Sequence, residues 1–199
     1  MATAGGHPRQ PNRIVQECGV GLVPIRRDTA GLAFAAPPLV RSGPVDETFV
    51  AGIAAVLGID RDEIVDSQWV DNGPGWVGIL LHDAASVLRI EPDFTRFPHR
   101  GSLDIGLVGA YPLGSECAFE VRGVFSDERG AMREDPVTGS LNASLAQWLL
   151  ASGRATAPYV TSQGTLLGRA GRPRINQDAG GTVWIGGDTV THIDGRIGT

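Results

Sequence analysis

The chain of 199 residues has the composition of an ordinary globular protein, with 42% hydrophobic and 20% charged residues. Its formal net charge of -5 and its scattered basic residues argue against nucleic acid as a partner. No stretch approaches the roughly 20 apolar residues of a membrane span, and no apolar signal-like segment follows Met1. We therefore expect a cytoplasmic protein with no membrane association.

The N-terminal third of the sequence predicts a leader, a hairpin and a helix. Residues 1–13 lack periodicity and contain several structure breakers, as is typical of a loose leader. Segments 14–27 and 31–40 alternate in hydrophobicity around a turn, which predicts a hairpin. An apolar pattern of helical spacing follows Asp46 and stops at Gly58, so we expect a helix between them.

The rest of the chain predicts many short strands and a second long helix. Strands are expected at 67–71, 76–83, 105–112, 117–125, 158–162, 174–177, 182–186 and 189–193, with one or two helical turns at 84–90. The long helix is expected at about 138–152, with one apolar stripe formed by Leu141, Leu145, Trp148 and Leu149. Many short strands with two helices indicate an α+β fold.

The stretch EDPVTGS at 134–140 precedes this second helix. The first turn of a helix presents backbone N–H groups without helical partners, which favour binding of a carboxylate or phosphate. Gly139 would let a ligand approach the backbone, and the hydroxyls of Thr138 and Ser140 could add hydrogen bonds. Helix capping by Asp135 or Thr138 is the alternative interpretation, and the local pattern leaves both open.

A second polar cluster contains Asp71, Asn72, Gly73 and Trp76. A turn between two strands would explain Asn72 and Gly73. A position facing a binding cleft is the alternative.

Several motifs together resemble the PhzF-like family of phenazine-biosynthesis isomerases. They are QECGVGL at 16–22, VDNGPGW at 70–76, EDPVTGS at 134–140, SQG at 162–164 and VWIGG at 183–187. The resemblance implies the diaminopimelate-epimerase-like fold, in which two domains each wrap a barrel-like mixed sheet around a central helix and the active site lies between them. Residues 14–40 and 172–199 would then form part of a first domain, and 41–171 a second domain containing the helix at 138–152.

The resemblance also implies a function. Family members move a proton within a small carboxylate-bearing substrate, such as a dihydro-hydroxyanthranilate, without metal or organic cofactor. It would make Asp135 the catalytic residue and would place the substrate carboxylate on Gly139 and Ser140. Thr138 and Asn142 would be further substrate-binding residues. Asn72 and Gly73 would be possible cleft residues.

The sequence departs from the family pattern at two places. The family's general acid/base glutamate and a Gly-His-Pro turn lie well before the QECG motif, whereas only about 15 residues precede it here, and we interpret Gly6-His7-Pro8 as a coincidence of composition. Asn142 stands where many relatives carry histidine, and an amide cannot shuttle protons. We therefore expect a chain shortened at its N-terminus, either an isomerase or an inactive homologue that binds a carboxylate or serves as an assembly partner.

The expected shortening has a consequence for partners. Strands left without neighbours expose edges and apolar surface, which proteins cover by pairing or assembly. We expect a homodimer, or a separate partner, that covers the incomplete first domain.

Other chemistries have weaker support in the sequence. Cys18 and Cys117 are expected to be buried small side chains rather than a racemase thiol pair. His7, His82, His99 and His192 are far apart, so no metal site is expected. No phosphate-binding loop and no G-x-S-x-G motif is present.

Overall fold

The computed structural model describes residues 13–29, 31–96, 103–126, 131–190, 192–193 and 195. Within these ranges the helices are α1 (Glu47–Leu57), α2 (Ala84–Leu88) and α3 (Gly139–Ala151). The strands are β1 (Arg13–Cys18), β2 (Gly21–Asp28), β3 (Gly31–Ala35), β4 (Arg41–Pro44), β5 (Ile64–Asp71), β6 (Trp76–Leu81), β7 (Asp104–Ala110), β8 (Phe119–Ser126), β9 (Met132–Asp135), β10 (Tyr159–Gln163), β11 (Arg174–Gln177) and β12 (Val183–Gly187). Short 3-10 turns occupy Arg61–Glu63, Phe94–Arg96 and Thr165–Leu167.

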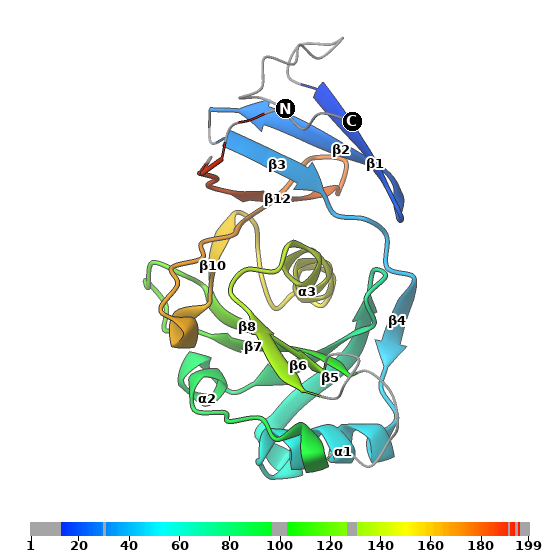
Figure 1. Ribbon diagram of the computed structural model, residues 1–199, viewed down its shortest axis with the longest axis vertical. Coiled ribbons are helices and arrows are strands. Elements are labelled where there is room, and N and C mark those ends of the chain that lie inside the picture. Colours follow the sequence, from blue (N-terminus) through cyan, green and yellow to red (C-terminus); the bar gives the residue numbers. More distant parts are fainter. Residues whose placement is uncertain are drawn as a thin grey trace.

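The strands join into one mixed sheet in the order β1-β2-β3-β12-β11-β10-β8-β7-β6-β5-β4, with β9 added beside β8. The pairs β6–β7 and β8–β10 are parallel, while the hairpins of β1 to β3 and of β4 to β6 are antiparallel. Figure 1 shows this sheet curving around α3, with β10 on one side, β4 on the other, and β3 and β12 above. The predicted α+β class, a barrel-like mixed sheet around a central helix, is confirmed.

The outer face of β5 to β8 is covered by α1 and α2, so the sheet lies between helices on both faces (Figure 1). β6 is buried along its whole length. Its alternate residues Val77 and Ile79 pack toward α1, whereas Trp76 and Leu80 pack toward α3. Burial on both faces explains why this strand is a continuous apolar run rather than an alternating one.

The close approach of α3 to the sheet depends on a row of glycines. Gly78, Gly106 and Gly123 are direct register neighbours on β6, β7 and β8. A Cβ atom at Gly106 would lie 2.3 Å from Leu141 Cδ1, and one at Gly78 would lie 2.9 Å from Trp148 Cζ3. Only glycine fits at the centre of this row, so α3 rests almost directly on the backbone of the sheet.

The predicted apolar stripe of α3 is buried as expected. The prediction that the helix has only one buried side was wrong. The opposite side of α3 is also buried, because Ala143 and Ala146 pack against Ile175, Val183 and Ile185 of β11 and β12. The sheet covers the helix from both sides, so every residue from Leu141 to Ala146 is buried, as are Trp148 and Leu149.

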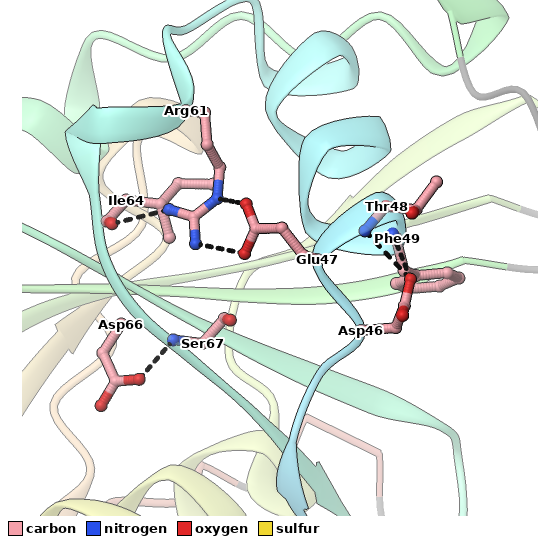
Figure 2. A network of polar contacts seen from close by, with 8 residues as sticks. All are labelled: Asp46, Glu47, Thr48, Phe49, Arg61, Ile64, Asp66 and Ser67. Atoms are coloured by element: carbon pink, nitrogen blue, oxygen red, sulfur yellow. Dashed lines mark hydrogen bonds and ion pairs between the residues drawn. The ribbon is translucent and has the colours of Figure 1, made fainter.

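The predicted boundaries of the first helix are confirmed. Asp46 caps α1 by accepting the backbone N–H groups of Thr48 and Phe49 at 2.9 and 3.2 Å (Figure 2). Gly58 closes it in the left-handed conformation, with φ +66°. Figure 2 also shows the ion pair that joins Glu47 to Arg61, with a Nε–Oε1 distance of 2.6 Å, which fastens the helix to the following turn.

Several sequence predictions differ from the structure. The segment 14–27 is not one strand but the hairpin of β1 and β2, because residues 19–20 form a turn. No strand occurs among the described residues of 189–193, and the sequence did not predict β4 or β9. The leader lies outside the described residues except Arg13, which begins β1.

The predicted division into domains stays a prediction. β10 pairs with β8 and also with β11, so the sheet continues through the proposed boundary near residue 172. None of the helices in the described part of the chain is long and apolar enough to cross a membrane.

Candidate functional site

A cavity of about 1080 Å³ lies between the sheet of β1, β2, β3 and β12 and the N-terminus of α3. Its walls are mostly apolar. They are formed by Gln16, Cys18, Val20, Val23, Ile25, Leu32, Ala33, Phe34, Pro37, Asn72, Gly73, Pro74, Val137, Gly139, Ser140, Ala170, Gly171, Arg172, Pro173, Ile185, Gly186, Gly187, Asp188 and Thr189. Four of the sequence-predicted site residues, namely Asn72, Gly73, Gly139 and Ser140, therefore meet in one cavity. Asp135, Thr138 and Asn142 are not among its lining residues.

The first turn of α3 is not capped by a side chain. Thr138 occupies the cap position with extended backbone angles, but its hydroxyl donates to Asp135 Oδ2 at 2.7 Å instead of accepting from the helix. Within the described residues, the backbone N–H groups of Gly139, Ser140 and Leu141 have no protein acceptor. Capping of this turn by a side chain is therefore wrong, and Gly139 and Ser140, which carry two of the free donors, line the cavity.

Gln163, a completely buried residue of β10, holds this uncapped turn in place. Its Oε1 accepts the backbone N–H of Thr138 at 3.0 Å. Its Nε2 donates to the backbone oxygen of Asp135 and to Thr138 Oγ1, both at 3.0 Å. The sequence analysis did not assign Gln163 to the site, although the SQG motif contains it.

Asn142 belongs to the same network. Its Nδ2 donates to Thr138 O at 2.9 Å and to Gln163 Oε1 at 2.7 Å, while its Oδ1 accepts from Thr161 Oγ1 at 2.7 Å. The side chain is 2% exposed and does not line the cavity. Its contacts position the turn, so direct substrate binding by Asn142 finds no support in its location.

The loop after β5 forms the neighbouring wall. Asn72 donates from Nδ2 to Ser140 O at 2.9 Å, and Trp76 Nε1 donates to Ser140 Oγ at 3.1 Å. Asp71 Oδ1 accepts the backbone N–H groups of Gly73 and Gly75, both at 2.7 Å. The loop is thus both a stabilised turn and a cavity wall, and Asn72 Oδ1 is buried without a partner in the described structure.

Two glycines permit the loops beside α3 to pack closely. A Cβ atom at Gly164 would lie 2.5 Å from Pro136 O, and one at Gly171 would lie 2.4 Å from Val137 Cγ2. Gly164 also has φ +86°, which disfavours any other residue. The 136–138 segment is therefore fixed against β10 and the loop at 171.

The two cysteines have different environments. Cys117 is buried as predicted, and burial raises the pKa of its thiol. The prediction of burial was wrong for Cys18, which is exposed at the end of β1 and lines the cavity. The described residues contain no cluster of three or more His, Cys, Asp or Glu side chains that could hold a metal; His7 and His99 lie outside them.

The fold and site define a class of protein, which comparisons with solved structures confirm. A curved mixed sheet around a buried helix, with the N-terminus of that helix at a cavity, is the diaminopimelate-epimerase-like architecture. A PhzF-family phenazine biosynthesis protein of Bacillus anthracis is similar with a TM-score of 0.63 and 15% identity, over 89% of this chain and 64% of that one. A predicted epimerase of Pseudomonas aeruginosa is similar with a TM-score of 0.64 and 18% identity, over 94% and 66%.

The sequence comparison identifies the family. The sequence model of the PhzC-PhzF family, described as phenazine biosynthesis-like protein, matches residues 1–195, and the chain belongs to this family. A curated relative, antisense-enhancing sequence 1 of Schizosaccharomyces pombe, is 26% identical over an alignment of 200 positions, which covers 92% of this chain and 66% of the relative. The chain thus spans slightly less than two thirds of the length of these relatives.

Proposed function

We propose that this chain forms the carboxylate-binding wall of a cofactor-independent isomerase, which moves a proton within a small carboxylate-bearing substrate. The observation that carries the proposal is the uncapped first turn of α3 at the cavity. Unpaired N–H groups and the helix dipole together favour an anion at this place. Membership of the phenazine biosynthesis-like family and the similarity to a predicted epimerase support an isomerase rather than another anion-binding protein.

In this proposal the residues at the mouth of α3 divide into two groups. The backbone N–H groups of Gly139 and Ser140, with the Ser140 hydroxyl, bind the substrate carboxylate. Thr138, Asn142 and Gln163 do not touch the substrate but hold these donors in position through their network. Positioning of this kind matters because prearranged donors need no reorganisation when charge develops.

Asp135 is the proposed proton-transfer group on this side of the site. Its Oδ2 accepts the Thr138 hydroxyl, and within the described residues its Oδ1 has no partner. Proton transfer between two carbon positions needs an acid and a base, and the second group would come from another chain or from a different residue. A second candidate is an inactive carboxylate-binding homologue, because Asp135 is not among the residues that line the cavity.

Solvent exchange during turnover tests the proposal. A dihydro-hydroxyanthranilate-type substrate is incubated with the protein in deuterated water, and deuterium in the recovered substrate or product is measured by mass spectrometry. We expect incorporation by the wild type and a loss of at least 100-fold in Asp135→Asn, the range of general acid–base catalysis. This variant keeps an acceptor for Thr138, so folding is preserved.

The exposed carboxylate Asp62 offers a matched control, because Asp62→Asn removes the same charge far from the cavity. Equal incorporation by wild type and Asp135→Asn would exclude the role of Asp135. Absence of incorporation in every protein, with binding of the substrate retained, would support the inactive homologue instead.

A further inference from the structure

Ser140, in the first turn of α3, is held from two directions by the loop between β5 and β6. Asn72 Nδ2 donates to the Ser140 backbone oxygen at 2.9 Å, and Trp76 Nε1 donates to the Ser140 hydroxyl oxygen at 3.1 Å. Both oxygen atoms of one residue therefore accept from the same loop. This arrangement fixes the side chain of Ser140 as well as its backbone.

The indole of Trp76 has little freedom to turn away from Ser140. The residue is 4% exposed and belongs to the same buried cluster as Leu80 of β6 and Leu141 and Leu145 of α3. Its N–H group is thus directed at Ser140 by packing that is complete before any ligand binds. A donor arranged in this way needs no reorganisation on binding.

The contact with Trp76 gives the Ser140 hydroxyl a direction. A serine hydroxyl can donate one hydrogen bond and accept two, so by itself it does not distinguish a donor from an acceptor on a ligand. Because Ser140 Oγ accepts from the indole, the hydroxyl proton must point away from Trp76. Within the described part of the chain this proton has no acceptor, and Ser140 lines the cavity, so the proton is available to a ligand there.

We propose that Trp76 is a positioning residue that commits the Ser140 hydroxyl to donation and so sets the preference of this cavity wall for a carboxylate over a carboxamide. Trp76 does not line the cavity and acts through Ser140. With the indole in place, the N–H groups of Gly139 and Ser140 and the Ser140 hydroxyl are all donors. A carboxylate accepts from all of them, whereas a carboxamide brings N–H groups that these donors cannot bind.

The indole also strengthens the hydroxyl as a donor. In a chain of hydrogen bonds each bond polarises the next, and the effect is larger away from water. Removal of the indole N–H should therefore weaken the binding of a carboxylate more than that of a carboxamide. The inference rests on the proposed function, because it takes this wall as the carboxylate site.

A double-mutant cycle tests whether Trp76 acts through Ser140. Anthranilate and anthranilamide are titrated by NMR into the wild type, Trp76→Phe, Ser140→Ala and the double variant. Phenylalanine keeps an aromatic ring in the core and removes only the N–H donor side of the indole. We expect Trp76→Phe to weaken anthranilate binding roughly threefold to tenfold and to have no further effect in the Ser140→Ala background. The preference for anthranilate over anthranilamide should fall by the same factor.

Trp184→Phe is the matched control. Its indole N–H donates to Asp178 Oδ2 at 2.8 Å, and Trp184 does not line the cavity. This variant should leave the affinity for both ligands unchanged. Circular dichroism checks that each variant is folded.

The indole resonances of the wild type give a second measurement, which does not depend on the folding of a variant. The Trp76 Nε1–H resonance should shift on addition of anthranilate, because the ligand accepts the proton of the hydroxyl that this N–H contacts. The Trp184 resonance should not shift. If Trp76→Phe does not fold, a Trp76 resonance that is unchanged at saturating anthranilate overturns the proposal.

The outcomes separate this inference from the proposed function. Equal binding of anthranilate by the wild type and Trp76→Phe would overturn the role of Trp76 and leave the carboxylate site intact. A loss in Trp76→Phe that is just as large in the Ser140→Ala background would also overturn it, since the indole would then act through general packing of α3. Failure of the wild type to bind anthranilate would overturn the proposed function and this inference together.

Discussion

Gln163 shows how one buried side chain fixes the geometry of the site. Its amide joins β10 to the backbone of Asp135 and Thr138 and to the side chain of Asn142. Removing the amide leaves the Thr138 N–H without this partner, and the Asp135 backbone oxygen and the Asn142 amide each lose one hydrogen bond. Burial makes an unpaired polar group costly. The network therefore couples the stability of the fold to the position of the free N–H groups of α3.

The first prediction concerns this amide. Gln163→Ala is expected to lower the free energy of unfolding by about 2–4 kcal/mol, because several buried polar groups lose their partner at once. Thermal or urea unfolding followed by circular dichroism measures the change. Gln177→Ala, at an exposed amide on β11, is the control and should change stability by less than about 0.5 kcal/mol. Equal effects of the two substitutions would contradict the role given to Gln163.

The second prediction concerns Asp104, at the start of β7. Burial, and then the neighbouring charge of Asp71, raise the pKa of this carboxyl above its ordinary value of 3.8. The folded protein holds the proton more tightly than the unfolded chain, so the Asp104 contribution to stability falls as pH rises from about 3.8 through the folded pKa. At neutral pH Asp104 is ionised, and the fold accommodates this form less well than the protonated form.

Asp104→Asn should therefore raise the melting temperature at pH 7, by roughly 1–3 °C, and should lose this advantage below the ordinary pKa of aspartate. Melting curves of wild type and variant between pH 3 and 8, bracketing the ordinary pKa, measure the effect. Asp62→Asn is the exposed control and should show no such crossover. A lower melting temperature for Asp104→Asn than for the wild type at pH 7 would contradict the claim that ionised Asp104 destabilises the fold.

At the scale of elements, α3 and the glycine row of β6, β7 and β8 form one packing unit. Gly106 is the centre of the row, and its distance to Leu141 leaves no room for a methyl group. The helix can reach its position only if these strands carry no side chain there. The mouth of α3, and with it the site, therefore depends on residues that never touch the cavity.

The third prediction follows from this packing. Gly106→Ala should destabilise the fold by about 1–3 kcal/mol, since overpacking forces the helix or the strand to shift. Chemical unfolding measures the change, and Gly19→Ala, where nothing lies within 4 Å, is the control. If both substitutions were neutral, the close contact between α3 and the sheet would be disproved.

The elements that the sequence predicted well are those with strong local signals. Asp46 and Gly58 cap α1, and the boundaries of α3 are within one residue of the prediction. β4 and β9 were not predicted because their short sequences acquire a strand conformation only by pairing with β5 and β8. The hairpin turn at 19–20 was missed because the alternation in hydrophobicity continues through it.

Part of the site could be predicted because it too has a strong local signal in the sequence. The dense motif before α3 indicated Thr138, Gly139 and Ser140, and two of these line the cavity. Sequence could not show that the Thr138 hydroxyl turns away from the helix, nor that Gln163 replaces it as partner of the backbone, because both depend on β10 lying beside this turn. The exposure of Cys18 likewise follows from the free edge of β1 and not from its residue type.

At the scale of the whole molecule, the site exists because the curved sheet brings distant segments together. The β1–β3 and β12 strands form one wall, the loop at 72–74 a second, and the mouth of α3 a third. Figure 1 shows α3 enclosed by the curved sheet, and Gly139 and Ser140 at its N-terminus line the cavity.

A titration of the free backbone donors tests this account most directly. Anthranilate, a stable carboxylate related to the proposed substrate class, is added to isotopically labelled protein while the backbone amide resonances are followed by NMR. We predict saturable shifts centred on Gly139, Ser140 and Leu141, and none of comparable size with anthranilamide, which lacks the negative charge. The account is contradicted if these three resonances do not respond to the carboxylate, or if they respond equally to the uncharged amide.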